Sequence, residues 1–499
     1  MTGAERIESY RAHLEEFEHT LNRELFLFYS GQKSRLEARS IYSDYSDFFS
    51  LEQIQEAKAE LDQTELASSR LKSTRKIIGY LMDQHLDLQT IQLTQEIEQF
   101  EADERVVWEG QEIPLSLIPP RLHQESDAKK RRSLYDTYMG ALQKSELKIN
   151  KLSQLRAAAV GLGFKTYTEA REHICGVDFR QLLYSFDAAM NELEDVFKDQ
   201  FRNSLEMSLG IPYREAGSWD LAHWLKKNDE ENVFSEIGLH PVVNAAKEAL
   251  GIQPEHPDAV LHETARETLK YGRPFCIPLR IPQEIRIVVF PGRGFLQYAS
   301  LLHENGHAHG FAWTSASLPA EHRIWGDRAL SEAYGFLFES LMRDSHWLER
   351  MLSFKNRANF MRFQWLFHVF LMLRSAAKLR FALGLHESES FERIPELFSE
   401  TMQSYTGLRH QPEAWLGEVL DEFESADYLR GGILEAMLRE YLRSKYGRAW
   451  FLNRSAGRFL KEIWETGMLY RADELCREIG FANLDPQILA EELLGGLKA

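Results

Sequence analysis

The sequence has few cysteines and no closely spaced pair of them. Its 499 residues include only three, Cys175, Cys276 and Cys476, which are odd in number and far apart. A disulfide framework or a zinc ribbon would need cysteines in pairs, often as C-x-x-C. The sequence therefore predicts neither kind of site.

The sequence also lacks an apolar stretch long enough to cross a membrane. The strongest candidate, residues 365–373, contains His368 and is much shorter than the roughly 20 residues that a spanning helix needs. The first ten residues are charged from Glu5 onward and contain no apolar segment of the kind found in secretory signals. These absences predict a cytoplasmic protein that makes no membrane contact.

Blocks of basic residues are missing as well. The formal net charge is −17, and acidic and basic residues are mixed along the chain. Nucleic acids and anionic membranes are bound by basic surfaces, so neither is an expected partner. The charge mainly favours solubility. The sequence sets no oligomeric state.

The chain does contain an H-E-x-x-H motif, the pentapeptide H-E-N-G-H at positions 303–307. Residues 297–308 are expected to be helical, which places His303 and His307 one turn apart on the same face, where both can bind one metal ion. Neutral imidazoles suit zinc, and the adjacent Glu304 can take a proton from water at the metal and return it. The motif predicts one Zn²⁺ per chain.

A hydrolytic zinc site also needs a third protein ligand and one open position. The next strong helix pattern spans residues 326–339, and Glu332 lies within it, 25 residues after His307. A loop and a returning helix fit between them, which predicts His303, His307 and Glu332 as metal ligands on two packed helices. The alternative is that Glu332 is a surface residue paired with Arg328, one turn earlier.

This arrangement resembles the zinc oligopeptidases of the thimet oligopeptidase and oligoendopeptidase F type. The similarity rests on the H-E-x-G-H form of the motif, the later Glu332, a strand pattern at 285–290 followed by a glycine-containing turn, and a "leucine, glycine, aromatic, then Tyr" element within 161–169. It is strongest over residues 285–342. The resemblance implies a helical zincin-like metallopeptidase with two lobes around a deep channel.

Apolar residues recur at helical spacing over almost the whole chain, which predicts a mainly α fold. Residues 1–150 are expected to form an N-terminal helical lobe, and residues 151–499 the helical catalytic domain with the zinc site. Strand patterns occur only within 274–290, where prolines indicate edge strands beside the zinc helix. Such an edge can pair with an extended peptide, or the hairpin simply packs under the helix. The proline-rich stretch 113–120 predicts a loop or a lobe junction.

Residues that would support the metal site lie on the same two helices. Asp327 and Glu339 are each placed to accept the free N–H of a zinc-bound imidazole, a contact that fixes the orientation of the ring. Surface charge is the alternative for Glu339. His309 follows the second motif histidine by two positions, so it points away from the ligand pair and is not expected to bind the metal.

The resemblance further implies that a tyrosine and a nearby histidine, late in the chain, stabilise the oxyanion of the reaction. This chain has Phe423-Glu424 where such a tyrosine is expected, within the segment 420–432. Tyr428 and His410 are the nearest candidates for the catalytic donors. Arg430 is a candidate for holding a substrate carboxylate.

The predicted function is zinc-dependent hydrolysis of peptide bonds in short or unfolded peptides, by an oligoendopeptidase. Zinc lowers the pKa of water toward about 7. Glu304 acts as the general base and then delivers the proton to the leaving amine. Peptide substrate is the only partner that the sequence predicts.

Three alternatives remain open. A helical zinc carboxypeptidase would share the motif and the later glutamate. A non-catalytic zinc-binding helical protein would be consistent with the altered segment at Phe423-Glu424. A helical di-iron protein would use two E-x-x-H motifs, and a second one occurs at 16–19.

Overall fold

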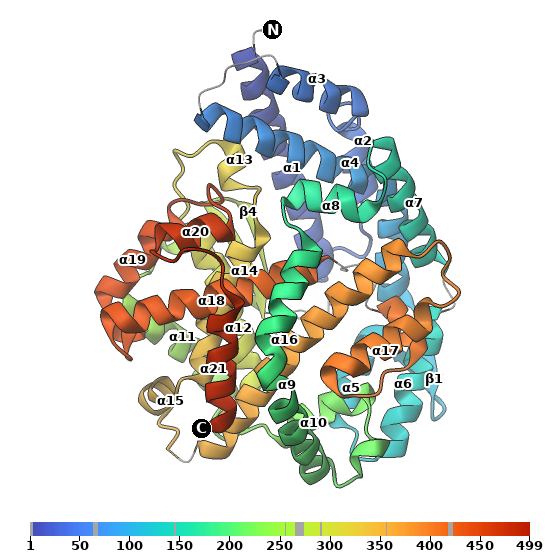
Figure 1. The fold of residues 1–499 in the computed structure, drawn as a ribbon, viewed down its shortest axis with the longest axis vertical. Helices are drawn as coiled ribbons and strands as arrows, with labels where there is room; N and C mark the ends of the chain where they lie inside the picture. Colours follow the sequence, from blue (N-terminus) through green and yellow to red (C-terminus); the bar gives the residue numbers. More distant parts are fainter. Residues whose placement is uncertain are drawn as a thin grey trace.

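In the computed structural model, the described part of the chain comprises residues 3–62, 68–143, 146–254, 256–264, 274–289, 292–355, 357–417 and 423–499. It is mainly helical (Figure 1), which confirms the predicted fold class. The helices of the first half are α1 (Gly3–Tyr29), α2 (Ala38–Asp44), α3 (Leu51–Asp62), α4 (Ser68–Asp103), α5 (Ile118–Gln124), α6 (Ala128–Gln143), α7 (Leu147–Gly161), α8 (Tyr167–Cys175), α9 (Phe179–Leu209), α10 (Leu221–Lys227) and α11 (Glu236–Leu250). Those of the second half are α12 (Phe295–Ala312), α13 (Ala320–Arg323), α14 (Arg328–Glu339), α15 (Ser345–Leu352), α16 (Ala358–Glu387), α17 (Ile394–Thr406), α18 (Glu424–Tyr446), α19 (Arg454–Trp464), α20 (Ala472–Glu478) and α21 (Pro486–Lys498). Among the described helices, none combines the length and the apolar character needed to span a bilayer.

The described strands form two small sheets. One is a hairpin of β1 (Arg105–Trp108) and β2 (Gln111–Pro114); the other has the order β3-β5-β4, from β3 (Val260–Thr264), β4 (Phe275–Arg280) and β5 (Glu284–Val289). β4 and β5 form the expected antiparallel hairpin, and β4 is an edge strand. The expectation that β5 is also an edge is wrong, because β3 pairs with it in parallel and no proline lies within it. Phe290 and Pro291, the expected strand end and turn, lie outside the described residues.

The proline-rich stretch 113–120 is not a loop, and its role as a lobe junction stays a prediction. Its start completes β2, and its end begins α5, where Pro119 and Pro120 lie in the first helical turn. A proline costs no intrahelical hydrogen bond there, because the first N–H groups of a helix have no partner within the helix. The other strand of this hairpin, β1, buries Val106 and Trp108 and exposes the alternate residues.

Apolar residues from both ends of the chain share one hydrophobic core. It includes Phe17 of α1, Trp464 of α19 and Leu493 of α21. In Figure 1 the first four helices form the upper part of the molecule, above α12, α14 and α18. Residue 150 lies within α7, so the division into an N-terminal lobe (1–150) and a catalytic domain (151–499) stays a prediction.

Candidate metal centre

Two glycines allow α12 and α14 to pack unusually close together. A Cβ atom at Gly306 would lie 2.2 Å from the backbone oxygen of Tyr334, and one at Gly335 would lie 2.8 Å from the ring of His303. Side chains at these positions would collide with a neighbouring backbone or with the imidazole. The contact therefore brings the H-E-x-x-H face of α12 against Glu332 of α14.

The three predicted metal ligands converge on one point. Nε2 of His307 lies 3.0 Å from Nε2 of His303, which lies 3.6 Å from Oε2 of Glu332. Ligand atoms of all three residues lie within 4.8 Å of one another, and the described residues contain no other such group of three or more. His309 is outside it, with Nδ1 2.9 Å from the backbone oxygen of Asn305.

A zinc ion fits this donor set. Oε2 of Glu332 is buried and has no hydrogen-bond partner, which is costly for a carboxylate oxygen. The lone pairs of two neutral imidazole nitrogens that face each other repel unless a cation lies between them. Two histidines and a glutamate are also the ligand set of known hydrolytic zinc sites. The residues present can therefore hold Zn²⁺.

The imidazoles of His303 and His307 each make a polar contact through the nitrogen that faces away from the site. Nδ1 of His303 lies 3.0 Å from Oε2 of Glu339, and Nδ1 of His307 lies 2.7 Å from Oγ of Ser331. These contacts orient both rings with Nε2 toward the site. Of the two candidates from the sequence, Glu339 makes this contact and Asp327 does not. Ser331 was missed, because a single serine on a helix carries no signal.

Glu304 lies beside the ligand cluster and accepts a hydrogen bond from the backbone N–H of Cys276 on β4. Burial raises the pKa of Glu304 to about 7, although the nearby His303 opposes the shift. A carboxyl group with a pKa near neutrality can both accept and release a proton. Burial also raises the pKa of the Cys276 thiol well above its ordinary value, which favours the protonated thiol over the reactive thiolate.

A cavity of about 1780 Å³ opens onto the centre and is lined by Glu304, His307 and Glu332. Its walls include β4 and parts of α14, α16 and α18, and also α1 and α4 from the start of the chain. Glu18 and His19 on α1 are among the lining residues, although the predicted ligands and catalytic residues all lie after residue 300. The cavity therefore draws its walls from both halves of the chain.

The first helix covers one end of the edge strand. Asn22 of α1 donates a hydrogen bond to the backbone oxygen of Pro278 at 3.1 Å, and Nδ1 of His19 lies 2.8 Å from that of Leu279. The His19 side chain is therefore engaged in a contact with β4. The described residues hold no second metal-binding group at Glu16 and His19, which a di-iron protein would require.

The two candidate oxyanion donors occupy different places. Tyr428 lines the cavity, and its ring lies 5.8 Å from that of Phe336, which packs against His303 at 5.2 Å. His410 does not line the cavity; its ring packs edge-on against Phe398 at 5.9 Å. The expectation of a catalytic role for His410 is not supported, because its position after α17 directs it to a different core.

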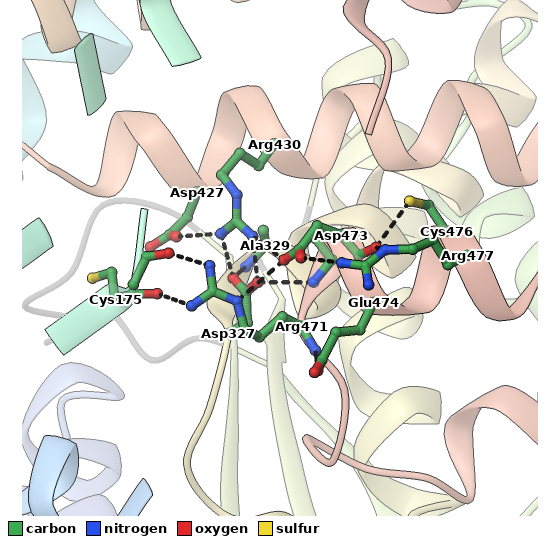
Figure 2. A network of polar contacts seen from close by, with 12 residues as sticks. Cys175, Asp327, Ala329, Asp427, Arg430, Arg471, Asp473, Glu474, Cys476 and Arg477 are labelled. Atoms are coloured by element: carbon green, nitrogen blue, oxygen red, sulfur yellow. Dashed lines mark hydrogen bonds and ion pairs between the residues drawn. The ribbon is translucent and has the colours of Figure 1, made fainter. Parts of the chain in front are cut away.

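Two other positions singled out in this part of the chain can now be placed. Phe423 is buried and stacks on Phe179 with ring centroids 4.7 Å apart, so it faces the core, whereas Glu424 lines the cavity. Arg430 is buried and donates to both carboxylate oxygens of Asp327, at 2.6 and 2.5 Å (Figure 2), so it does not hold a substrate carboxylate. Two residues apart on a helix, Tyr428 and Arg430 point in nearly opposite directions. Residues 420–422 lie outside the described part of the chain.

Asp327 fixes the start of the helix that carries Glu332. Its carboxylate accepts hydrogen bonds from the backbone N–H of Ala329 at 3.2 Å and of Ala472 at 2.8 Å, in addition to the pair from Arg430. Figure 2 shows these contacts joining α14, α18 and α20. Asp327 is thus an N-cap and a tie between three helices.

Comparison with known proteins supports the fold. No family model matches the sequence, and no curated protein matches it. A structure assigned as an oligoendopeptidase F from Bacillus anthracis str. Ames matches with a TM-score of 0.67 at 13% identity, over 93% of this chain and 84% of that one. Another structure assigned as an oligoendopeptidase F gives 0.72 at 14% identity, over 100% and 92%. Trypanosoma cruzi metallocarboxypeptidase 1 gives 0.60 at 14%, over 99% and 100%. The chain has the fold of these helical peptidases.

Proposed function

We propose that this protein is a zinc metallopeptidase that hydrolyses peptide bonds in short or unfolded peptides. The observation that carries the proposal is the convergence of His303, His307 and Glu332 at the wall of a large cavity, with Glu304 beside them. The shared fold with peptidases adds support. A zinc ion held there would supply Lewis acidity toward water and toward the peptide carbonyl.

The residues of this chain then have separate tasks. Glu304 accepts the proton of the attacking water and delivers it to the leaving amine, for which a pKa near 7 is well suited. Glu339 and Ser331 hold the two imidazoles in their coordinating orientation. The phenol of Tyr428, at the cavity wall, is the candidate hydrogen-bond donor to the oxyanion.

The edge of β4 gives the substrate a backbone to pair with. This strand lines the cavity, and its Cys276 N–H already reaches the general base Glu304. An extended peptide that adds to the edge would lie along the metal centre. Folded proteins do not offer such a free strand, which supports short or unfolded peptides as the substrate class.

A zinc carboxypeptidase is the second candidate. The shared fold with the Trypanosoma cruzi metallocarboxypeptidase favours it, and two guanidinium groups that line the cavity, those of Arg328 and Arg374, are of the kind that binds a terminal carboxylate. A peptide with an amidated C-terminus separates the two activities. An endopeptidase cleaves it internally, whereas a carboxypeptidase requires the free carboxylate.

The test combines metal content with cleavage of a mixed library of internally quenched peptides. The proposal expects about one zinc per chain, cleavage that a chelator stops, and recovery when zinc is returned. Products analysed by mass spectrometry then show internal cuts or stepwise loss of C-terminal residues. One zinc with no cleavage of any peptide would instead identify a non-catalytic zinc-binding protein, and absence of zinc would refute the metal centre.

A further inference from the structure

A second cavity, of about 910 Å³, shares a wall with the cavity of the metal centre. Trp325, Gly326 and Arg328 line both, whereas His307, Glu304 and Glu332 line only the first. The remaining walls of the second cavity come from α3, α4, residues 162–164 before α8, α8 itself, Asp427 of α18 and the start of α20. It is therefore a separate compartment that touches the segment leading into α14.

Positive charge dominates this cavity, although the whole chain is acidic. Seven lysines and arginines line it, against four carboxylates, in a chain of net charge −17. All four carboxylates already face cations: Asp83 pairs with Arg171, Asp327 and Asp427 face Arg430, and Glu474 pairs with Lys72. The carboxylates of the lining are thus already engaged and do not account for the remaining cations.

Three of the lining cations form no ion pair with a described carboxylate, although Asp327 and Glu474 are close enough to act on the pKa of Lys76. Lys76 contacts only backbone oxygens, those of Trp325 at 3.5 Å and of Met468. Lys58 lies over the ring of Phe164, 6.0 Å from its centroid. Arg75 is exposed and makes no polar contact with described residues. Cations that gather around a cavity without ion-pair partners repel one another, and a bound anion would relieve that repulsion.

Three of the cations that line the cavity are regularly spaced along one face of α4. Lys72, Arg75 and Lys76 stand at positions i, i+3 and i+4, so they share one face of the helix, and that face lines the cavity. Lys58 reaches the same space from α3, which packs against α4. Burial lowers the pKa of Lys76 to about 8, a shift that a bound anion would reverse.

We propose that this cavity binds a small organic anion that carries two or more phosphate groups. Tetrahedral phosphates offer several acceptor oxygens to lysine and arginine donors, which suits Lys58, Arg75 and Lys76. The rings of Phe164 and Trp325 also line the cavity and provide an apolar surface for the organic part of the ligand. Nothing in the peptidase reaction requires this compartment.

The ligand also acts on the metal centre through the shared wall. Lys76 is hydrogen-bonded to the backbone of Trp325, two residues before Asp327, which caps α14 and is held by Arg430 (Figure 2). Glu332 lies in the second turn of the same helix. Filling the cavity restrains this segment and slows the loss of zinc from Glu332. This second part rests on the proposed zinc site; the binding of the anion does not.

The first experiment titrates fructose 1,6-bisphosphate, as a probe with two phosphates, into the full-length protein by calorimetry at pH 7 and low salt. We expect one ligand per chain with a dissociation constant on the order of 1 mM or tighter. The variant Lys58→Gln/Arg75→Gln should bind at least about tenfold more weakly, since it loses two phosphate contacts. Arg202→Gln/Arg214→Gln removes the same charge from exposed sites outside the cavity and should leave binding within about twofold.

Absence of saturable binding, or equal weakening in both double variants, would overturn the anion site. Lysine acylation followed by mass spectrometry locates the ligand. The bound probe should protect Lys76 and Lys58 from acylation but not Lys227, and equal protection of all three would contradict the assignment. Zinc release to a chelator should slow at least twofold with the probe bound, in wild type only. Binding without this change would overturn the coupling, and a protein with no peptidase activity would still report on the anion site.

Discussion

Replacing Gly306 by alanine should disrupt the metal centre without touching a ligand. The new Cβ would lie 2.2 Å from the backbone oxygen of Tyr334, and the two must separate by about 0.8 Å to reach even 3.0 Å. The oxygen belongs to a helix backbone and cannot rotate aside, so α12 and α14 must move apart. Metal–ligand distances tolerate only about 0.2 Å, so the displacement is about four times what the site can absorb.

We expect Gly306→Ala to lower zinc affinity by at least about 100-fold and stability by about 1–3 kcal/mol. Zinc affinity is measured by competition with a chromophoric chelator, and metal-free stability by urea denaturation, which shows that the variant is folded. Gly140→Ala on α6 is the matched control, because a Cβ there meets nothing within 4 Å. If Gly306→Ala binds zinc within about twofold of wild type, the close helix contact does not position the ligands.

Three further predictions concern single side chains. Glu304→Gln should keep zinc and lose at least about 10²–10⁴-fold in kcat, because no carboxylate then takes the proton from water. Peptide cleavage by the zinc-loaded variant tests this, and retained turnover would contradict the assignment of Glu304 as the base. Glu339→Gln should weaken zinc binding about 10–100-fold by loosening His303, and a chelator titration that shows no change would reject that support. Asp327→Asn removes the carboxylate closest to the buried Arg430 and leaves only the more distant Asp427 and Asp473, so it should lower the free energy of unfolding by about 3 kcal/mol at neutral pH in urea denaturation. Burial raises the pKa of Asp327, but Arg430 outweighs burial, so the net pKa is lowered. The stabilisation by this ion pair is therefore present above pH about 4 and is lost as the pH falls further. Equal loss of stability in acid for wild type and variant would refute this assignment.

Helices could be predicted from the sequence where a periodic apolar face marks them. The pattern at 297–308 appears as part of α12, and that at 326–339 as α14 with Asp327 as its cap. The strand β3 could not be predicted in the same way, because its sequence VLHET has polar residues in the middle and is defined by pairing with β5. Long-range pairing has no local signature, which is why the place of β5 within the sheet was also missed.

The convergence of the three candidate metal ligands could be predicted because their geometry is local or nearly so. His303 and His307 belong to one helical turn, and Glu332 lies on the next strong helix pattern. The candidate oxyanion donors were harder to predict. His410 and Tyr428 were chosen because they lie in or near the segment 420–432 in sequence, whereas the role depends on which side chain lies close to the metal centre in space. His410 packs against Phe398 in another part of the core, whereas Tyr428 reaches the cavity through the contact between α14 and α18.

The contact between α1 and β4 would limit how much of the proposed peptide substrate can pair with this strand. Asn22 and His19 contact the backbone oxygens of Pro278 and Leu279, so an added peptide strand could pair with β4 only along 275–277, where it would compete with Glu304 for the N–H of Cys276. Three residues of strand span about 10 Å. A longer peptide gains no further backbone pairing there and must turn away from the strand. If the protein acts on peptides as proposed, the N-terminal helix α1 would end the pairing edge of β4, and peptides longer than this stretch would gain no further backbone pairing from it.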